Sequence, residues 1–380
     1  NGQGTIQMAR LDYIEVEYDR ELKLTDGQLY FKTNHAAPVS MRIAGCTRDV
    51  KIWDVTDPAD IRQLDVTING SDATFVANTG YRQFIAFNGN TPGYAISSTQ
   101  PVANQDIHSM ECPDMLIVSP APYMEAAQRL ADFHADRDGM TVHVLTPDVL
   151  YNEFSSGTPD VSAMRKALKM WYDRAVADGR KPVRYCLIMS RPTYDHKTAS
   201  RTADWELVPT WLSEGGISQT TSYSTEDFIG MLSDTPSLRG FSIGREPIHV
   251  AVGRLPVVSA AEADAMVSKI IDYVEKPEYG AWRNNIMIIA DDQDNAVHLT
   301  QAEKVFNLMN NNETGNSYLY ERLYLDTFKM EASPTGNKYP EAKEKMLKMW
   351  NEGLAYINYI GHASPKGWGH EDLLNWTDIN

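Results

Sequence analysis

Residues 115–145 read MLIVSPAPYMEAAQRLADFHADRDGMTVHVL, and this stretch decides the fold class. A continuous apolar run at 115–119 is followed by a segment of helical period, 122–138, which ends at Gly139. A second apolar run follows at 141–145. Short apolar runs without alternation are typical of strands that are buried on both faces. Two such strands joined through a helix predict a β-α-β unit with a parallel sheet.

The same alternation continues toward the C-terminus. A long segment at 191–245, rich in Thr, Ser, Gly and Asp, interrupts it, and a loop of that length usually carries function or leaves the sheet. The whole pattern predicts parallel strands covered by helices. The predicted strands are 184–189, 248–252, 285–290, 320–325 and 355–360, and the predicted helices are 161–178, 260–274, 299–310 and 340–351.

Residues 1–110 have a different pattern, without helical segments. Ile14, Val16 and Tyr18 alternate with acidic residues, which predicts a first, half-buried strand. Turn-rich sequence separates the further short runs, and 91–111 is predicted to be a linker. Short strands at this spacing favour an antiparallel sandwich or barrel. The further predicted strands are 50–55, 65–68, 74–76 and 83–87.

Composition excludes some classes of function. The net charge is −16 and the basic residues form no cluster, so we expect no nucleic-acid partner. No apolar stretch reaches the roughly 18–20 residues of a membrane helix, so we expect no membrane-spanning segment. The three cysteines, Cys46, Cys112 and Cys186, are too few and too far apart to predict a disulfide framework or a structural zinc site.

The segment AYINYIGHAS, residues 355–364, places His362 directly after a predicted strand. Open α/β sheets present their reactive groups at the carboxyl ends of their strands. A single His in this position is often structural or merely exposed. The small residues on either side favour a functional interpretation, because they let a substrate backbone approach closely.

Acidic residues follow a second predicted strand, 285–290. Asp291, Asp292 and Asp294 would lie at the same sheet edge as His362, with His298 shortly after them. These carboxylates could orient an imidazole, bind a cation or cap the next helix. Calcium takes six to eight oxygen ligands, and this run alone supplies too few. We therefore expect no metal and no cofactor, with calcium as the open alternative.

A His and an acid need a nucleophile to form a hydrolase. Ser364 is only two residues from His362, and side chains so spaced seldom converge outside a helix. Cys186 falls within a predicted core strand, where a free cysteine packs as a small apolar residue. Cys46 and Cys112 lie in the β-rich region and at the predicted domain junction, where we expect no basic partner that would lower a thiol pKa. We expect all three cysteines to be structural.

The string YIGHASPKGW, residues 359–368, with Glu371 shortly after it, resembles the catalytic-His motif of the gingipain family of cysteine peptidases. Within that family, it is most similar to the sortase-type members that serve type IX secretion. Two departures stand out: Ala363 replaces the usual Gly after the His, and the loop at 189–195 keeps only the last two residues of the family pattern. The other segments that agree are IWDVT at 52–56, YNEFSSGTPD at 151–160, VGRLPV at 252–257, WRN at 282–284 and ADD at 290–292.

The resemblance implies a caspase-like parallel sheet flanked by helices, preceded by a β-rich N-terminal domain. The expected domains are 1–110, the β-rich domain, and 111–275 and 276–380, two catalytic subdomains of which the second stops before the nucleophile. His362 matches the catalytic His, and Asp294 matches the acid that holds its ring. The backbone N–H of Ala363 is expected at the oxyanion, and the substrate-cleft candidates are Gly361, Trp368 and Asp195.

The implied function is that of a cysteine endopeptidase or transpeptidase at the cell surface or outer membrane. Its substrates would be secreted proteins with a C-terminal signal domain, and other secretion components could be partners. The nucleophilic Cys is expected beyond Asn380, so the 380-residue chain alone should be inactive. The alternative is a non-catalytic binding or scaffold module that keeps the fold; Ala363 and the changed loop motivate it.

Overall fold

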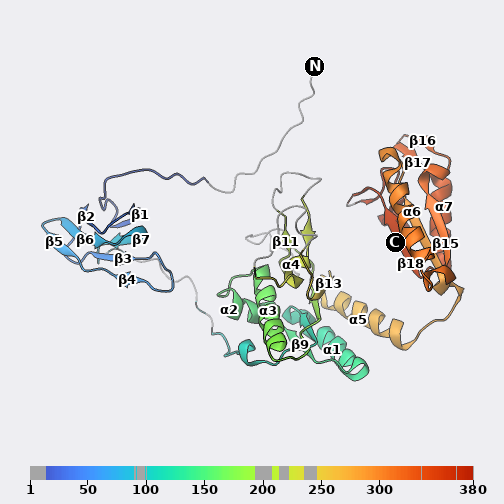
Figure 1. Ribbon diagram of the computed structural model, residues 1–380, viewed down its shortest axis with the longest axis horizontal. Helices are drawn as coiled ribbons and strands as arrows, with labels where there is room; N and C mark the ends of the chain where they lie inside the picture. The colour runs from blue at the N-terminus through green and yellow to red at the C-terminus, as the bar shows by residue number, and fades with distance from the viewer. Residues whose placement is uncertain are drawn as a thin grey trace, which may run out of the picture. The chain divides into compact units, whose positions relative to one another are not determined.

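A computed structural model describes residues 14–89, 91, 99, 101–192, 208–213, 222–234, 246–334, 336–364 and 366–379. The chain divides into two compact units, with the boundary after Asp106, and Figure 1 labels many of their elements. The three-domain division expected from the sequence stays a prediction. Among the described residues, no helix is both long and apolar enough to cross a membrane.

The first unit consists of two antiparallel sheets packed over one apolar core. One sheet has the order β1-β7-β3-β4 and the other has the order β2-β6-β5. The rings of Phe31, Phe75 and Phe84 contact one another in that core. The strands are β1 (Gln28–His35), β2 (Val39–Ala44), β3 (Lys51–Asp54), β4 (Arg62–Gln63), β5 (Thr67–Asn69), β6 (Asp72–Ala77) and β7 (Gly80–Phe87).

The strand predicted at Ile14, Val16 and Tyr18 is wrong. This segment has no strand pairing, and its three apolar side chains are exposed. An alternating pattern makes a stable strand only where one face covers a core, and no core lies under these residues. Lys32 of β1 instead forms ion pairs with Glu15 and Glu17. The first strand is β1, whose polar residues concealed it in the sequence.

The second unit begins with a four-stranded parallel sheet of order β13-β10-β8-β9. One face packs on α3, with Leu116 and Ile188 in the core, and the other packs on α1 and α5, with Ile117. The helix α2 was not predicted. The elements are β8 (Met115–Val118), α1 (Met124–Asp138), β9 (Val142–Leu145), α2 (Pro147–Phe154), α3 (Val161–Ala177), β10 (Tyr185–Met189), β13 (Ala251–Leu255) and α5 (Ala260–Glu275).

Helix α3 shows how the sequence sets an element's limits. Asp160 precedes it in extended conformation, and its carboxylate accepts a hydrogen bond from the backbone N–H of Ser162, which caps the helix. Between β10 and β13 the described part of the long loop contains a pair of short antiparallel strands and one helical turn. These are β11 (Trp211–Leu212), β12 (Ser224–Thr225) and α4 (Asp227–Gly230).

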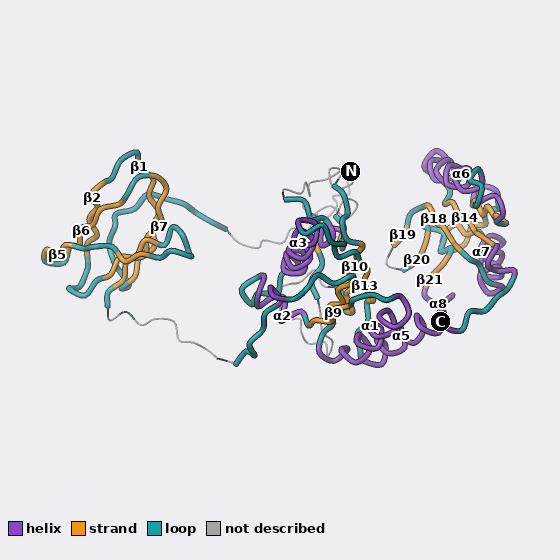
Figure 2. The backbone as a smooth tube through the Cα atoms, turned by 60° about the horizontal axis from the view of Figure 1, so that its bottom comes forward, coloured by secondary structure: helices purple, strands orange, loops and turns teal. Residues whose placement is uncertain are grey.

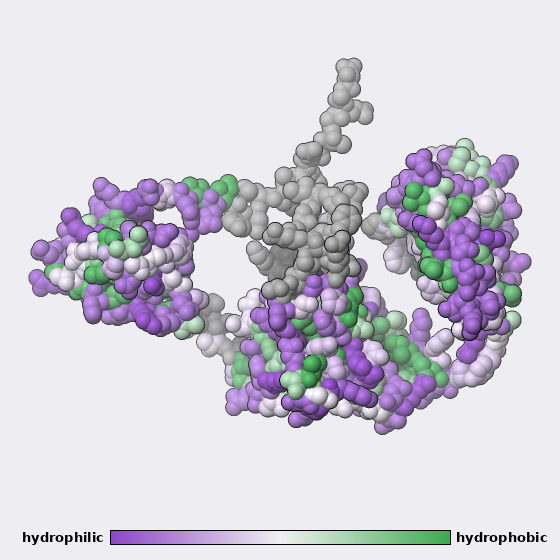
Figure 3. Space-filling view, viewed as in Figure 1, coloured by the Kyte–Doolittle hydropathy of each residue, from purple (hydrophilic) through white to green (hydrophobic). Residues whose placement is uncertain are grey.

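A three-stranded parallel sheet, of order β15-β14-β18, follows. Its two faces pack on different helices, α6 and α7, which lie on opposite sides of β14 and β18 in Figure 2. Figure 3 shows a largely hydrophilic surface over α7, which buries only Ala342 and Met346. The elements are β14 (Asn285–Ala290), α6 (Val297–Asn310), β15 (Leu319–Tyr324), α7 (Pro340–Glu352) and β18 (Tyr356–Ile360).

Short elements complete the C-terminal region. The hairpin of β16 (Glu331–Ser333) and β17 (Gly336–Lys338) precedes α7. After β18 come β19 (Ala363–Ser364), β20 (Gly367–Trp368), β21 (Leu374–Asn375) and α8 (Trp376–Ile379). The predicted α/β class, with parallel sheets between helices after a β-rich region, is confirmed.

Candidate active site

The pairing of two parallel strands positions the site. Ala290, the last residue of β14, is in register with Ile360, the last residue of β18. Beyond that pair, the N–H of Asp291 still donates to the carbonyl of Ile360, at 2.9 Å. The two loops that follow these strands therefore start side by side, as the sequence predicts for the carboxyl ends of neighbouring parallel strands.

The backbone of His362 is fixed by Asp291. The carboxylate Oδ2 of Asp291 accepts the N–H of His362 at 2.9 Å. This contact requires close approach at Gly361, where a Cβ would lie 2.3 Å from the Cβ of Asp291 and 2.6 Å from the hydroxyl of Tyr359. Gly361 was predicted as a substrate-cleft residue. The structure shows that glycine is needed here because a larger side chain would collide with Asp291 and Tyr359.

Two donors hold the carbonyl oxygen of His362. The hydroxyl of Tyr359 donates to it at 2.6 Å, and the N–H of Gly369 donates at 2.8 Å. The ring of Tyr359 stacks on Trp368, with 4.6 Å between centroids and 12° between planes. Trp368, another predicted cleft residue, is half-buried and packs against the apolar core under α7. The peptide groups on both sides of the His362 Cα thus have defined partners.

The side chain of His362 meets the predicted acid. Its Nε2 lies 2.5 Å from Oδ2 of Asp294, and both side chains are about half exposed, at 55% and 50%. The hydrogen bond to Asp294 raises the pKa of His362, and the same bond lowers the pKa of Asp294. Asp294 thereby stabilises the imidazolium form and fixes which ring nitrogen carries a proton. Nδ1 is left for a reacting group.

Asp294 also holds a second imidazole. The Nε2 of His298 lies 3.1 Å from the same Oδ2, and the two imidazole rings are nearly perpendicular, with 5.1 Å between centroids. The role of His298 was not predicted, although its spacing of four residues from Asp294 was the available signal. A carboxylate held from two sides has less freedom to rotate away from His362.

The turn that carries Asp294 has an unusual backbone. Gln293, Asp294, Asn295 and Ala296 all have positive φ angles, between 48° and 67°. Such conformations cost about 1–2 kcal/mol for each residue with a side chain, and they concentrate at functional sites. The N-cap of α6 is Ala296, without a side-chain hydrogen bond. The alternative that Asp294 or Asn295 caps this helix is therefore wrong.

Two predicted site residues remain, Ala363 and Asp195, together with Ser364, which was considered as a nucleophile and rejected. Ala363 begins the exposed strand β19, next to His362, where its N–H was predicted to face an oxyanion. Asp195 lies outside the described residues. Ser364, which sequence spacing argued against as a nucleophile, accepts through Oγ the backbone N–H of Lys366 at 3.1 Å.

The three cysteines are free thiols with raised pKa values. Burial is the main cause in each, and it raises the pKa of Cys186 to about 12. Cys46 and Cys186 are buried, and Cys112 is half-buried against the core under α3. A nucleophilic cysteine needs a depressed pKa. None of the three is a prepared nucleophile.

The model of one protein family, described as "Peptidase family C25", matches residues 108–380. The chain belongs to peptidase family C25. This is the gingipain family of cysteine peptidases, so the resemblance inferred from residues 359–368 is confirmed. None of the curated protein sequences matches the chain.

The chain is also similar to solved structures. The crystal structure of dimeric latent PorU from Porphyromonas gingivalis is 27% identical, with a TM-score of 0.60, over 69% of this chain and 26% of PorU. The chain thus spans about a quarter of the length of that protein. The Arg-specific cysteine proteinase gingipain R is 15% identical, with a TM-score of 0.47, over 73% of this chain and 52% of its own. The caspase-like, gingipain-type fold predicted from the sequence is confirmed.

Proposed function

We propose that this C25 member is the His- and acid-bearing part of a cysteine endopeptidase or transpeptidase. The observation that carries the proposal is the 2.5 Å contact between His362 Nε2 and Asp294 Oδ2. A hydrogen-bonded acid that fixes the tautomer of a His is the arrangement that activates a thiol in Cys–His catalysis. Its half-exposed position leaves the imidazole accessible to a substrate.

The nucleophile is proposed to come from polypeptide after Asn380. Strand β18 is at the edge of its sheet, paired only with β14 among the described strands. A further parallel strand pairing with β18 would end at the same edge as His362. That placement follows the family pattern, in which the nucleophilic Cys ends the strand after the catalytic His.

The reaction follows from these roles. His362 takes the thiol proton, the thiolate attacks a peptide carbonyl carbon, and the oxyanion forms near the N–H of Ala363. As the C–N bond breaks, the imidazolium returns the proton to the leaving amine and a thioester remains. Water then yields hydrolysis, and another amine yields transpeptidation. Asp294 stabilises the imidazolium in both halves of the reaction.

The substrate and location rest on the sequence resemblance to the sortase-type members of the family. We propose that the substrates are secreted proteins with a C-terminal signal domain and that the protein works outside the cytoplasm, at the cell surface. PorU, the similar solved structure, supports this assignment by fold and by 27% identity.

Covalent labelling tests the proposal. A chain that continues past Asn380 should be labelled by a thiol-directed peptide electrophile, and mass spectrometry should locate the label on a cysteine after that residue. The 380-residue chain should take up no label at the same reagent concentration. If the longer chain has no labelled cysteine, the non-catalytic scaffold becomes the better account.

A further inference from the structure

Two imidazoles converge on one carboxylate oxygen in the candidate active site. Oδ2 of Asp294 lies 3.1 Å from Nε2 of His298 and 2.5 Å from Nε2 of His362. One possible ligand atom from each of the three residues lies within 4.8 Å of the other two. Two imidazole nitrogens and a carboxylate oxygen are a common set of protein ligands for zinc. The cluster thus has the donor atoms of a transition-metal site.

The spacing of these atoms suits one shared ion. Zinc binds imidazole nitrogen at about 2.0–2.1 Å and carboxylate oxygen at about 2.0–2.2 Å, so two tetrahedral ligand atoms lie roughly 3.3–3.5 Å apart. The 3.1 Å contact of His298 is close to that separation. The 2.5 Å contact of His362 must lengthen slightly, and this half-exposed side chain has room to rotate. Zinc would take the place of the protons that now join the two nitrogens to Oδ2.

An ion can reach the cluster from solvent. The side chains of His362 and Asp294 are 55% and 50% exposed, and that of His298 is only 14% exposed. The two exposed groups are accessible, while the buried imidazole is held in place by its surroundings. Three protein ligands leave a fourth tetrahedral position open for water or another side chain. The exposed His370, whose ring centroid lies 5.8 Å from that of His362, is a candidate for this position.

No side-chain cation competes for the carboxylate. Among the described residues, the ion-pair partners of Asp294 are the two imidazoles, and no lysine or arginine forms an ion pair with it. A second His–Asp pair with the same four-residue spacing provides a comparison. Nδ1 of His134 lies 2.8 Å from Oδ2 of Asp138 on α1, and within the described chain no third ligand group joins that pair. The second imidazole therefore distinguishes the candidate metal site from an ordinary ion pair.

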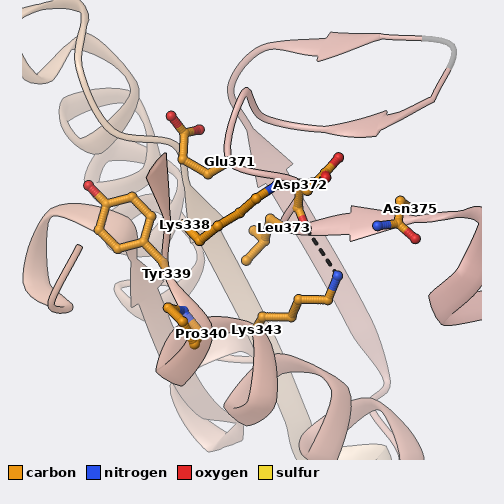
Figure 4. A pocket seen from close by; sticks show the side chains of 8 residues that line it. All are labelled: Lys338, Tyr339, Pro340, Lys343, Glu371, Asp372, Leu373 and Asn375. Carbon is orange, nitrogen blue, oxygen red and sulfur yellow. Dashed lines mark hydrogen bonds and ion pairs between the residues drawn. The ribbon is translucent and has the colours of Figure 1, made fainter. Parts of the chain in front are cut away.

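A cavity near the start of α7 is less suited to such an ion. Figure 4 shows this space, of about 350 Å³, and the side chains that line it. Lys338 contacts Oδ2 of Asp372 at 2.7 Å, and Lys343 contacts the carbonyl of Asp372 at 3.1 Å. The described lining contains no imidazole and no thiol, and its two ammonium groups repel cations. A metal that prefers nitrogen ligands should therefore bind at the imidazole pair.

We propose that Asp294, His298 and His362 bind a divalent transition-metal ion of the zinc type, and that the bound ion blocks His362 as a base. A neutral imidazole has one N–H nitrogen and one nitrogen with a free lone pair. An ion on Nε2 uses that lone pair and leaves the proton on Nδ1, so Nδ1 can no longer accept the proton of a thiol. The metal site rests on the geometry alone, and its inhibitory effect rests on the proposed peptidase function.

Zinc titration of the 380-residue chain, without an affinity tag, tests the site. Calorimetry on chelator-treated protein should show saturable binding, which magnesium at the same concentration does not reproduce. His298→Gln should weaken zinc binding by at least about tenfold, since even the loss of a group that only orients a metal ligand costs that much. His134→Gln, in the comparison pair on α1, should leave the affinity unchanged. His362→Gln provides a second test if His298→Gln does not fold.

Nitrogen-15 NMR of the imidazoles locates the ion. Zinc should shift the signals of His298 and His362, with coordination at Nε2 and a proton on Nδ1 of His362, and it should leave the signals of His134 in place. The site would be overturned by an absence of saturable binding, or by an affinity that is unchanged in His298→Gln and His362→Gln. An equal loss of affinity in His134→Gln would also overturn it.

Peptide cleavage by a chain that continues past Asn380 tests the inhibition. Zinc should lower kcat/KM at the concentrations at which it binds, and a chelator should restore the parent value. The ratio of kcat/KM with and without zinc separates the effect of the ion from any change in basal activity. Half-inhibition of His298→Gln should need at least about tenfold more zinc than half-inhibition of the parent.

Two results would overturn the inhibitory role. One is full activity at saturating zinc, and the other is equal zinc sensitivity of the parent and His298→Gln, which would place the inhibiting ion on another group such as the thiol. A longer chain that binds zinc as expected but cleaves no peptide would contradict the peptidase proposal, and the inhibition with it, while supporting the metal site.

Discussion

Nε2 of His362 lies 2.5 Å from Oδ2 of Asp294, although 68 residues separate them in the chain. The contact exists because β14 and β18 are adjacent and parallel, so that the loops after them leave the sheet at one edge. A left-handed turn at residues 293–296 then directs Asp294 toward the imidazole. Sheet topology brings the loops together, and local backbone conformation directs the carboxylate.

The first prediction concerns the pKa of His362. Asp294→Asn removes the charge that favours the imidazolium, so the pKa of His362 should fall toward the ordinary histidine value of about 6.5. NMR titration of the imidazole carbon-bound protons measures it directly. Asp173→Asn, on α3 and paired with Lys169, removes a charge elsewhere and should leave the pKa of His362 unchanged. Equal effects of both substitutions would contradict the pairing.

The second prediction is a pH dependence of stability. Because the folded state raises the pKa of His362, its pairing with Asp294 stabilises the fold fully below the unfolded pKa of about 6.5. That contribution is lost as pH rises through the higher, folded pKa. The stability difference between the parent chain and Asp294→Asn, measured by urea unfolding, should therefore shrink from pH 5.5 to pH 9. A difference that grew with pH would contradict the sign.

The third prediction concerns close packing at Gly361. Gly361→Ala would place a Cβ against Asp291 and Tyr359, and it should destabilise the protein by about 1–3 kcal/mol, as overpacking does. Gly253→Ala is the matched control, because its Cβ would meet only the Leu187 side chain at an ordinary 3.8 Å. Denaturant unfolding of both variants checks this. Comparable stability of the two would show that the loop has room to move.

The fourth prediction tests the donor to the His362 carbonyl. Tyr359→Phe keeps the ring that stacks on Trp368 and removes only the hydroxyl. It should cost about 0.5–1.5 kcal/mol of stability, the usual value of one hydrogen bond. Tyr356→Phe, three positions earlier on the same strand and half exposed, should change stability little. Amide exchange at Gly369, which shares the acceptor, should be faster only in the first variant.

The strand and helix pattern made much of the fold predictable. The strands β8, β10, β14 and β18 are buried on both faces or flanked by helices. Their continuous apolar sequences therefore predicted strands of a covered parallel sheet. The strand prediction for Ile14–Tyr18 was wrong because alternation shows only that a segment could have one apolar face. It does not show that a hydrophobic core packs against that face. Strand β1 and helix α2 were missed because polar residues break their apolar patterns.

The site was predictable where it depends on sheet order and unpredictable where it depends on side-chain direction. Parallel strands placed His362 and the acidic run at one edge, and the family resemblance selected Asp294. No sequence pattern showed that Asp291 turns inward to hold the His362 N–H, or that Glu371 joins it. Those contacts depend on the path of the loop after β19, which follows from packing of Tyr359 on Trp368.

Peptide cleavage by a chain that continues past Asn380 tests the central claim most directly. The kcat/KM of the parent should be measured on a mixed peptide library, beside His362→Ala and the control His134→Ala on α1. Loss of the general base should lower kcat/KM by about 10²–10⁴-fold or more in His362→Ala, while the control should keep the parent value. A His362→Ala protein that cleaves peptides at the parent rate would contradict the account.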